Sequence, residues 1–187
     1  VRIVRTWSQN PGGTAADRIE IEASCSDAVP WGIVAALTGA GRAAATIFGP
    51  RAAAQGSLSA NWDGDSWSGT VAGRITAVDA ASCAAALGAL AAGEATIGLD
   101  GVAWRRGRLS DGTIDWSVGP GWIDGRLLDR MAAAFGSPPR ATASIAGAKE
   151  SFDAMACRIR IGPDGVQMQA AAAILSSSRP SIQPGPT

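Results

Sequence analysis

The segment LSANWDGDSWSGTVAGRI, residues 58–75, contains the clearest structural signal in this chain. Apolar or small side chains alternate with polar ones on both sides of Asp63-Gly64, and a period of two is that of a half-buried β-strand. Asp-Gly suits a tight turn, because glycine adopts positive φ without a clash and aspartate tolerates the same region. The segment therefore predicts a β-hairpin, in which Gly69 and Gly73 leave room for close approach by a ring, a backbone or a ligand.

Four further Asp-Gly pairs punctuate the chain. We expect Asp100-Gly101 and Asp164-Gly165 to join paired strands, as Asp63-Gly64 does. Asp111-Gly112 is expected inside a bulged strand, and Asp124-Gly125 at the start of a helix. Aspartates used in turns and caps are poor candidates for catalysis.

Alternating runs elsewhere predict more strands, at residues 18–23, 95–104, 114–118 and 155–170, the second and the fourth each folded as a hairpin. Capping aspartates and apolar residues at helical spacing predict short helices at residues 27–40, 79–87 and 124–135. Residues 8–16 indicate a loop, and residues 42–54 are ambiguous because alanine favours a helix while Gly49-Pro50 breaks one.

These elements predict a mainly β fold of the α+β type. We expect an antiparallel β-meander of hairpins, curved into a groove, with two or three short helices. Residues 1–175 would form a single β-rich domain or a fragment of a longer repeat protein, since hairpins and helices recur in a loose order. Residues 176–187 lack apolar periodicity and predict a mobile tail.

The composition excludes several classes of partner and site. Sixteen basic and sixteen acidic residues cancel among 187, so no electrostatic attraction for nucleic acid follows. The chain has no histidine, and Cys25, Cys83 and Cys157 lack the spacing of metal ligands. Three buried thiols, or one disulfide and a spare thiol, both fit this count. No signal peptide or membrane span is visible, and what precedes Val1 is open.

The residues needed for catalysis are scarce. Lys149 with Ser144 or Ser151 is the one candidate nucleophile and base, and such a pair arises often by chance in a polar loop. The candidate acid pairs for glycoside hydrolysis come from Asp63, Asp65, Glu94 and Asp115. Asn61, Asp63 and Asp65 begin like a calcium loop, but its glycine and final glutamate are missing. We therefore expect a protein without catalytic activity, without a cofactor and without a metal site.

Seven tryptophans are the unusual chemical resource of the chain. Indole rings fill cores, stack on sugars or line apolar grooves. Four of the seven lie on the expected hairpins, where a shared open face would make them a binding surface.

Three stretches resemble the strand, turn, strand units of the AsmA-like and TamB-like bacterial envelope proteins. They are residues 56–64, GSLSANWDG, residues 67–75, WSGTVAGRI, and residues 95–104, ATIGLDGVAW. Residues 107–128 are similar to that family's strand followed by a short helix, and residues 152–168 to its closing strand pair. The resemblance spans about residues 31–172 and is one of pattern. The chain departs from that family in lacking the amino-terminal membrane anchor and in being far shorter than a bridge across two membranes, as expected of a fragment or a domain of a larger envelope protein.

The resemblance implies a non-catalytic domain of envelope biogenesis whose apolar β-groove binds or conducts lipid-like molecules between membranes. It implies a place in the bacterial envelope, facing the periplasm, in a membrane-anchored protein whose anchor is not in this chain, with other envelope proteins as partners. Neither the lipid nor the oligomeric state follows. A carbohydrate-binding or adhesin module using tryptophan faces, and a purely structural scaffold, are the alternatives. The residues expected to line the groove are Leu58, Trp62, Trp67, Val71, Ile75, Ile97, Leu99, Trp104, Ile114 and Trp116.

Overall fold

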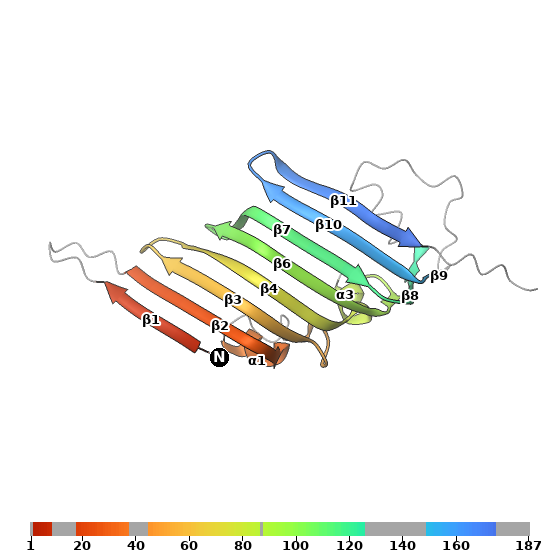
Figure 1. Ribbon diagram of the computed structural model, residues 1–187, viewed down its shortest axis with the longest axis horizontal. Helices are drawn as coiled ribbons and strands as arrows, with labels where there is room; N and C mark the ends of the chain where they lie inside the picture. The colour runs from red at the N-terminus through yellow and green to blue at the C-terminus, as the bar shows by residue number, and fades with distance from the viewer. Residues whose placement is uncertain (1, 9–17, 38–44, 87, 126–148, 175–187) are drawn as a thin grey trace, which may run out of the picture.

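The computed structural model describes residues 2–8, 18–37, 45–86, 88–125 and 149–174 (Figure 1). Three predicted segments lie wholly or mostly outside these ranges: residues 9–16 of the expected loop, most of the expected helix at residues 124–135, and the tail at residues 176–187. Within them the chain is mainly antiparallel β-structure, which confirms the predicted fold class.

Eight strands form one open, uncurled sheet, so the predicted curvature into a groove is wrong for the described residues (Figure 1). Every neighbouring pair is antiparallel, and the order β1-β2-β3-β4-β6-β7-β10-β11 follows the order of the chain. The strands are β1 (Arg2–Ser8), β2 (Arg18–Pro30), β3 (Ala53–Trp62), β4 (Trp67–Asp79), β6 (Glu94–Arg105), β7 (Arg108–Val118), β10 (Ala154–Gly162) and β11 (Gly165–Ile174).

The remaining described elements gather at one end of this sheet, which we call the covered end (Figure 1). They are helix α1 (Trp31–Leu37), helix α3 (Ala80–Ala86) and a small antiparallel sheet of β5 (Ala91–Ala92), β8 (Gly121–Asp124) and β9 (Lys149–Phe152). The opposite end of the large sheet carries the turns β3–β4, β6–β7 and β10–β11, and we call it the turn end.

The hydrophobic core lies between the covered end of the large sheet and these smaller elements. Its buried members come from the large sheet, from the small sheet and from the segment before β3. They are Ala52, Ile75, Val78, Ala95, Val118, Ile123 and Phe152, with Trp31, Phe48 and Cys83 among the half-buried side chains packed against them. Six of the thirteen buried hydrophobic residues in the described ranges are alanines, as expected for a chain rich in alanine.

The hairpin at residues 58–75 is confirmed. Trp62 pairs with Trp67, and the register runs without a break from there to Ala53 and Thr76. The four-residue turn between the strands is held by the Asp63 carboxylate, which accepts hydrogen bonds from the backbone N–H groups of Asp65 and Ser66 at 3.0 and 2.8 Å. The turn after β10 is also confirmed, since Gly162 pairs with Gly165 across Pro163-Asp164.

The turn predicted at Asp100-Gly101 is wrong. Both residues lie inside the continuous strand β6, at a bulge where two residues of β6 oppose one residue of β4. Positive φ, here 56° at Gly101, serves a bulge as well as a turn. The chain reverses instead at Arg106-Gly107, where φ is 52° and 71°, as a two-residue type I′ hairpin requires.

The Asp111-Gly112 prediction is confirmed, because the pairing of β6 with β7 shifts register there and Gly112 has a φ of 119°. The predicted helix at residues 27–40 begins later than expected. Asp27 and Pro30 belong to β2, and α1 starts at Trp31. Asp124 is the last residue of strand β8 and Gly125 directly after it is helical, which agrees with the helix start predicted at Asp124-Gly125.

Asp79 caps α3 as predicted. Its carboxylate accepts hydrogen bonds from the backbone N–H groups of Ala81 and Ser82, both at 3.2 Å, and from the Ser82 hydroxyl at 2.7 Å. The hydrogen bond from the Ser82 hydroxyl, more than any other cause, lowers the pKa of Asp79. Strand β1 and the small sheet were not predicted from sequence.

Candidate binding surface

The ten residues predicted to line a groove share one face of the large sheet, which we call the apolar face. Directly paired residues point to the same side of a sheet, so the register of the strands alone places all ten on this face. The pairs are Trp62 with Trp67, Leu58 with Val71, Ile75 with Ile97, Ile97 with Trp116, Leu99 with Ile114, and Trp104 with Gly69.

Three of the ten belong to the covered end and pack in the core. Ile75 is 6% exposed and is a core member, and Ile97 and Trp116 are half-buried against the core. Residues of α1, α3 and the small sheet supply the other side of these contacts. These three side chains therefore stabilise the fold, and the scaffold alternative describes this half of the face.

The rest of the apolar face runs from the middle of the strands to the turn end, and no described element outside the large sheet contributes to it. Leu58, Val71, Leu99 and Ile114 are half-buried along its middle. At the turn end, Trp62 and Trp104 are half-buried and Trp67 is 38% exposed. We call these seven residues, with Leu109 and Val166, the open apolar surface.

Leu109 and Val166 were not among the predicted residues. Leu109 pairs with Trp104, and Val166 pairs with Ile161, so both lie on the apolar face near the turn end. They are 56% and 67% exposed. The alternation of apolar and polar residues in β11 predicts that Val166 lies on the apolar face. Leu109 stands between Arg108 and Ser110 beside a bulge, which interrupts the alternation, so the sequence does not show its face.

The tryptophans at the turn end do not form one flat platform. The rings of Trp62 and Trp67 lie 5.6 Å apart between centroids and are tilted by 50°. The Trp104 ring covers Gly69, where a Cβ atom would lie 2.6 Å from ring atom Cζ2. This confirms that a glycine on the apolar face accommodates an indole ring. Sugar stacking uses a flat exposed ring, and the Trp62 and Trp67 rings do not share one plane.

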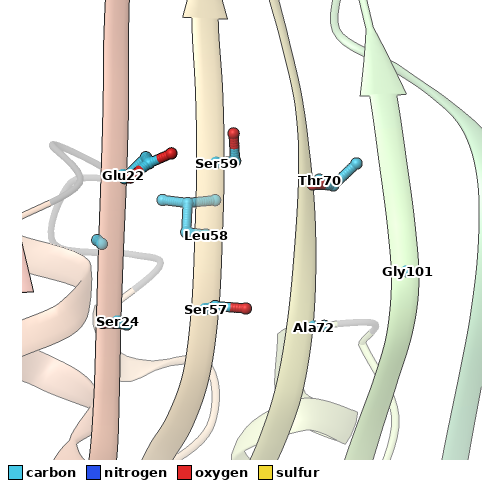
Figure 2. Close-up of a pocket in the computed structure, with 9 residues that line it drawn as sticks. Glu22, Ser24, Ser57, Leu58, Ser59, Thr70, Ala72 and Gly101 are labelled. Atoms are coloured by element: carbon cyan, nitrogen blue, oxygen red, sulfur yellow. The ribbon is translucent and has the colours of Figure 1, made fainter. Parts of the chain in front are cut away.

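The opposite face of the sheet is polar and has a shallow depression of about 290 Å³ over strands β2, β3, β4 and β6 (Figure 2). Register places Glu22, Ser59 and Thr70 in one row, and Ser24, Ser57 and Ala72 in the next. The row of small side chains explains the hollow. Leu58 borders it but belongs by register to the apolar face.

The carboxylates considered for catalysis are engaged separately. Asp63 holds its turn, and hydrogen bonds from the Ser66 and Asp65 backbone lower its pKa. Asp115 accepts two hydrogen bonds from the Arg158 guanidinium, at 2.6 and 3.0 Å, which lowers the pKa of Asp115. A carboxylate oxygen of Glu94 lies 3.5 Å from a guanidinium nitrogen of Arg51. Asp65 is exposed in the β3–β4 turn.

The other candidate groups are Lys149 and the three cysteines. The Lys149 ammonium lies 4.1 Å from the centre of the Trp122 ring. All three cysteines are free and half-buried rather than buried. Burial raises the pKa of the Cys83 and Cys157 thiols, with a smaller contribution from a nearby carboxylate in each case. In the described part of the chain, no cluster of three metal-ligating side chains occurs.

The fold and surface define a class: an open antiparallel sheet with one polar face and one apolar face, the latter half covered. Comparison with known proteins finds no matching family model, no similar curated protein and no similar solved structure. None of the helices in the described ranges has the length and apolar character needed to cross a membrane.

Proposed function

We propose that this protein binds lipid-like molecules on the open apolar surface, as a non-catalytic domain of the bacterial envelope. One observation carries the proposal: the apolar face continues well beyond the core, and most of its large side chains there are half-buried or exposed, with Val102 and Ile161 as the buried exceptions. Trp67, Leu109 and Val166 are three of the six large exposed apolar side chains in the described chain, and all three lie on this surface. A contiguous patch of this kind is typical of an interaction site.

An open face buries only one side of an acyl chain, so we expect weak binding. A fully buried methylene contributes about 0.8 kcal/mol, and an acyl chain lying on an open face keeps its outer side in water, so each methylene contributes roughly half of that. Sixteen methylenes would then contribute roughly 6 kcal/mol, which is comparable with the lower estimates of the entropy lost on association. We therefore propose transient binding, which suits a protein that passes lipids along a face rather than storing them.

The polar face supports the same arrangement. Serine, threonine, glutamine and arginine side chains occupy it in β3, β4 and β10, and Asp115 of β7 forms an ion pair there with Arg158 of β10. A sheet with one wet face and one apolar face is suited to water on one side and acyl chains on the other. Envelope proteins that deliver or receive lipid would be its partners.

The test is titration with a fluorescent fatty-acid analogue, followed by native mass spectrometry with lysophospholipid. The test variant is Leu109→Ser with Val166→Ser, because both side chains are exposed and their replacement leaves the core intact. The matched control is Ile33→Ser with Leu90→Ser, since these side chains are 52% and 63% exposed and lie off the apolar face.

We expect saturable binding by the wild type, weakening of about tenfold in the test variant, which loses two apolar contacts, and no change in the control. Equal binding by both variants would refute the assignment of the surface. If the wild type binds neither probe and binds oligosaccharides instead, the carbohydrate alternative replaces the proposal. Absence of all binding supports the scaffold alternative.

A further inference from the structure

Strands β1 and β11 form the two edges of the large sheet (Figure 1). An edge strand presents unpaired backbone N–H and C=O groups, and proteins guard such edges with charged residues, proline or bulges. Strand β1, at one edge, contains Arg2 and Arg5. Strand β11, at the other, has the sequence GVQMQAAAAI, with no charge and no proline over ten residues, and its one register shift lies in its second half, between Ala170 and Ala172.

No described strand pairs with the outer side of β11, whose inner side pairs with β10 from Gly165 to Ala170 and, after a register shift, from Ala172 to Ile174. The side chains alternate in a regular way near its start. Val166 and Met168 belong by register to the apolar face, and the exposed Gln167 and Gln169 belong to the polar face. Such a strand is a template for one more antiparallel strand.

We propose that two copies of this protein associate edge to edge through β11, about a two-fold axis perpendicular to the sheet. Neighbouring antiparallel strands are related by an axis of this kind, so the apolar faces of both copies lie on the same side. With Met168 of one copy opposite Met168 of the other, Gln167 of each copy faces Gln169 of its mate. The two amides can then exchange hydrogen bonds across the junction.

A second copy paired through β11 fits better than the other edge-to-edge arrangements. Contact between β11 and the β1 edge of a second copy would leave new edges on an uncurled sheet, and the assembly would grow without closing. The sequence of β1 contains two arginines, and charged residues of this kind guard an edge strand against pairing with its own copy. The β11 pairing is closed and carries no like charges.

This inference rests on the proposed function for its biological meaning, because the dimer would join two open apolar surfaces into one wide surface. Val166, on that surface, would lie beside the junction. The dimer itself is a property of the protein alone, so it is measured without lipid.

The first experiment is sedimentation velocity over a range of protein concentrations. The wild type is expected to reach twice the chain mass of 18.8 kDa and to grow no further. The variant Gln167→Lys with Gln169→Lys places ammonium groups opposite each other at two equivalent contacts, and is expected to raise the dissociation constant of the dimer roughly tenfold.

The second experiment is a charge exchange. The variant Gln167→Glu with Gln169→Lys places a carboxylate opposite an ammonium at both contacts, so the dimer is expected to re-form. A general disturbance of β11 would weaken both double variants alike. Gln55→Lys on β3, exposed on the same face away from the edge, is the control for added charge.

A wild type that is monomeric at all concentrations overturns the inference, and unlimited growth shows that β1 and β11 pair instead. Face-to-face association is detected by Trp67→Ser, which would disrupt such a dimer but leaves the edge-paired dimer intact. A dimer that binds no lipid refutes the proposed function alone, whereas a monomer that binds lipid refutes the dimer alone.

Discussion

At the scale of single residues, Gly69 shows how a missing side chain can position a large one. The Trp104 ring lies over it from the neighbouring strand, and a Cβ atom at position 69 would also overlap the Ser59 carbonyl oxygen. The alternation of the sequence predicted that Gly69 lies on the apolar face, but the sequence could not show which ring covers it. That depends on the bulge in β6, which sets the register of Trp104.

We predict that Gly69→Ala lowers the free energy of unfolding by about 2 kcal/mol, because the ring and strand β3 must move to admit the methyl group. Urea denaturation followed by tryptophan fluorescence measures the change. The matched control is Gly98→Ala, where the added Cβ lies 3.5 Å from that of Asp115, an ordinary contact. Equal losses in the two variants would contradict this role of Gly69.

Asp79 gives a prediction on pH dependence. The pKa of its carboxyl is below the usual 3.8 in the folded protein, so the ionised cap stabilises the fold above that pH. The stabilisation is lost as the pH falls through the lower, folded value. We expect Asp79→Ala to cost about 1 kcal/mol at neutral pH, and the difference from the wild type to shrink in acid.

Thermal unfolding monitored by circular dichroism between neutral pH and pH 2 checks the Asp79 prediction. Asp79→Asn is the control, because its amide oxygen still accepts a hydrogen bond but cannot titrate. A difference between Asp79→Ala and wild type that stays constant down to the lowest pH would argue against a titrating cap.

At the scale of elements, the sequence predicts where the backbone adopts positive φ, but not whether that residue forms a turn or a bulge. The same Asp-Gly pair forms part of a turn at residue 63, part of a bulge at residue 100, and part of a register shift at residue 111. Local sequence favours the backbone conformation but not its role, which depends on the strands alongside. The turn at Arg106-Gly107 was missed because arginine seldom adopts positive φ.

The bulge in β6 leads to a prediction about deletion. Leu99 and Val102 both lie on the apolar face although three positions separate them, because β6 has one residue more than β4 and β7 there. Removing Gly101 makes the pairing regular and leaves every side chain on its present face. We therefore expect the Gly101 deletion to fold with a cooperative thermal transition and a native near-ultraviolet spectrum.

The control is a deletion of Ser59, in a part of β3 with unbroken pairing on both sides. A one-residue slip there sends half of the strand to the opposite face, so Leu58 or Trp62 would point into water. We expect this deletion to abolish the folded spectrum. If both deletions unfold the protein, the bulge has a structural role beyond its extra residue.

At the scale of the whole molecule, the sheet divides into two halves that alternation could not distinguish. The sequence placed ten apolar side chains on one face, and the register agrees for all ten. It could not separate the buried Ile75 from the exposed Trp67, because α1, α3 and the small sheet are brought to the covered end by contacts remote in sequence. The strands of the small sheet are too short to give a periodic signal.

This division predicts a gradient of local stability along the strands. Amide hydrogen exchange followed by mass spectrometry should be slowest in peptides covering residues 75–78, 95–97 and 116–118, where the core packs against the sheet. Peptides at the turn end of the same strands, residues 67–70 and 102–105, should exchange faster. Uniform protection along β4, β6 and β7 would show that something also covers the turn end.

The agreement between strand order and chain order has a consequence for how the molecule is made. Each strand of the large sheet pairs with the strand of that sheet that precedes it in the chain, so no pairing waits for a distant segment to be synthesised. A chain leaving the ribosome can add each strand to an edge that is already complete, and folding of this kind is fast for a β-protein because its contacts are local. The same property makes the sheet extensible in evolution, because duplication of one hairpin in the gene lengthens it without disturbing any existing pair.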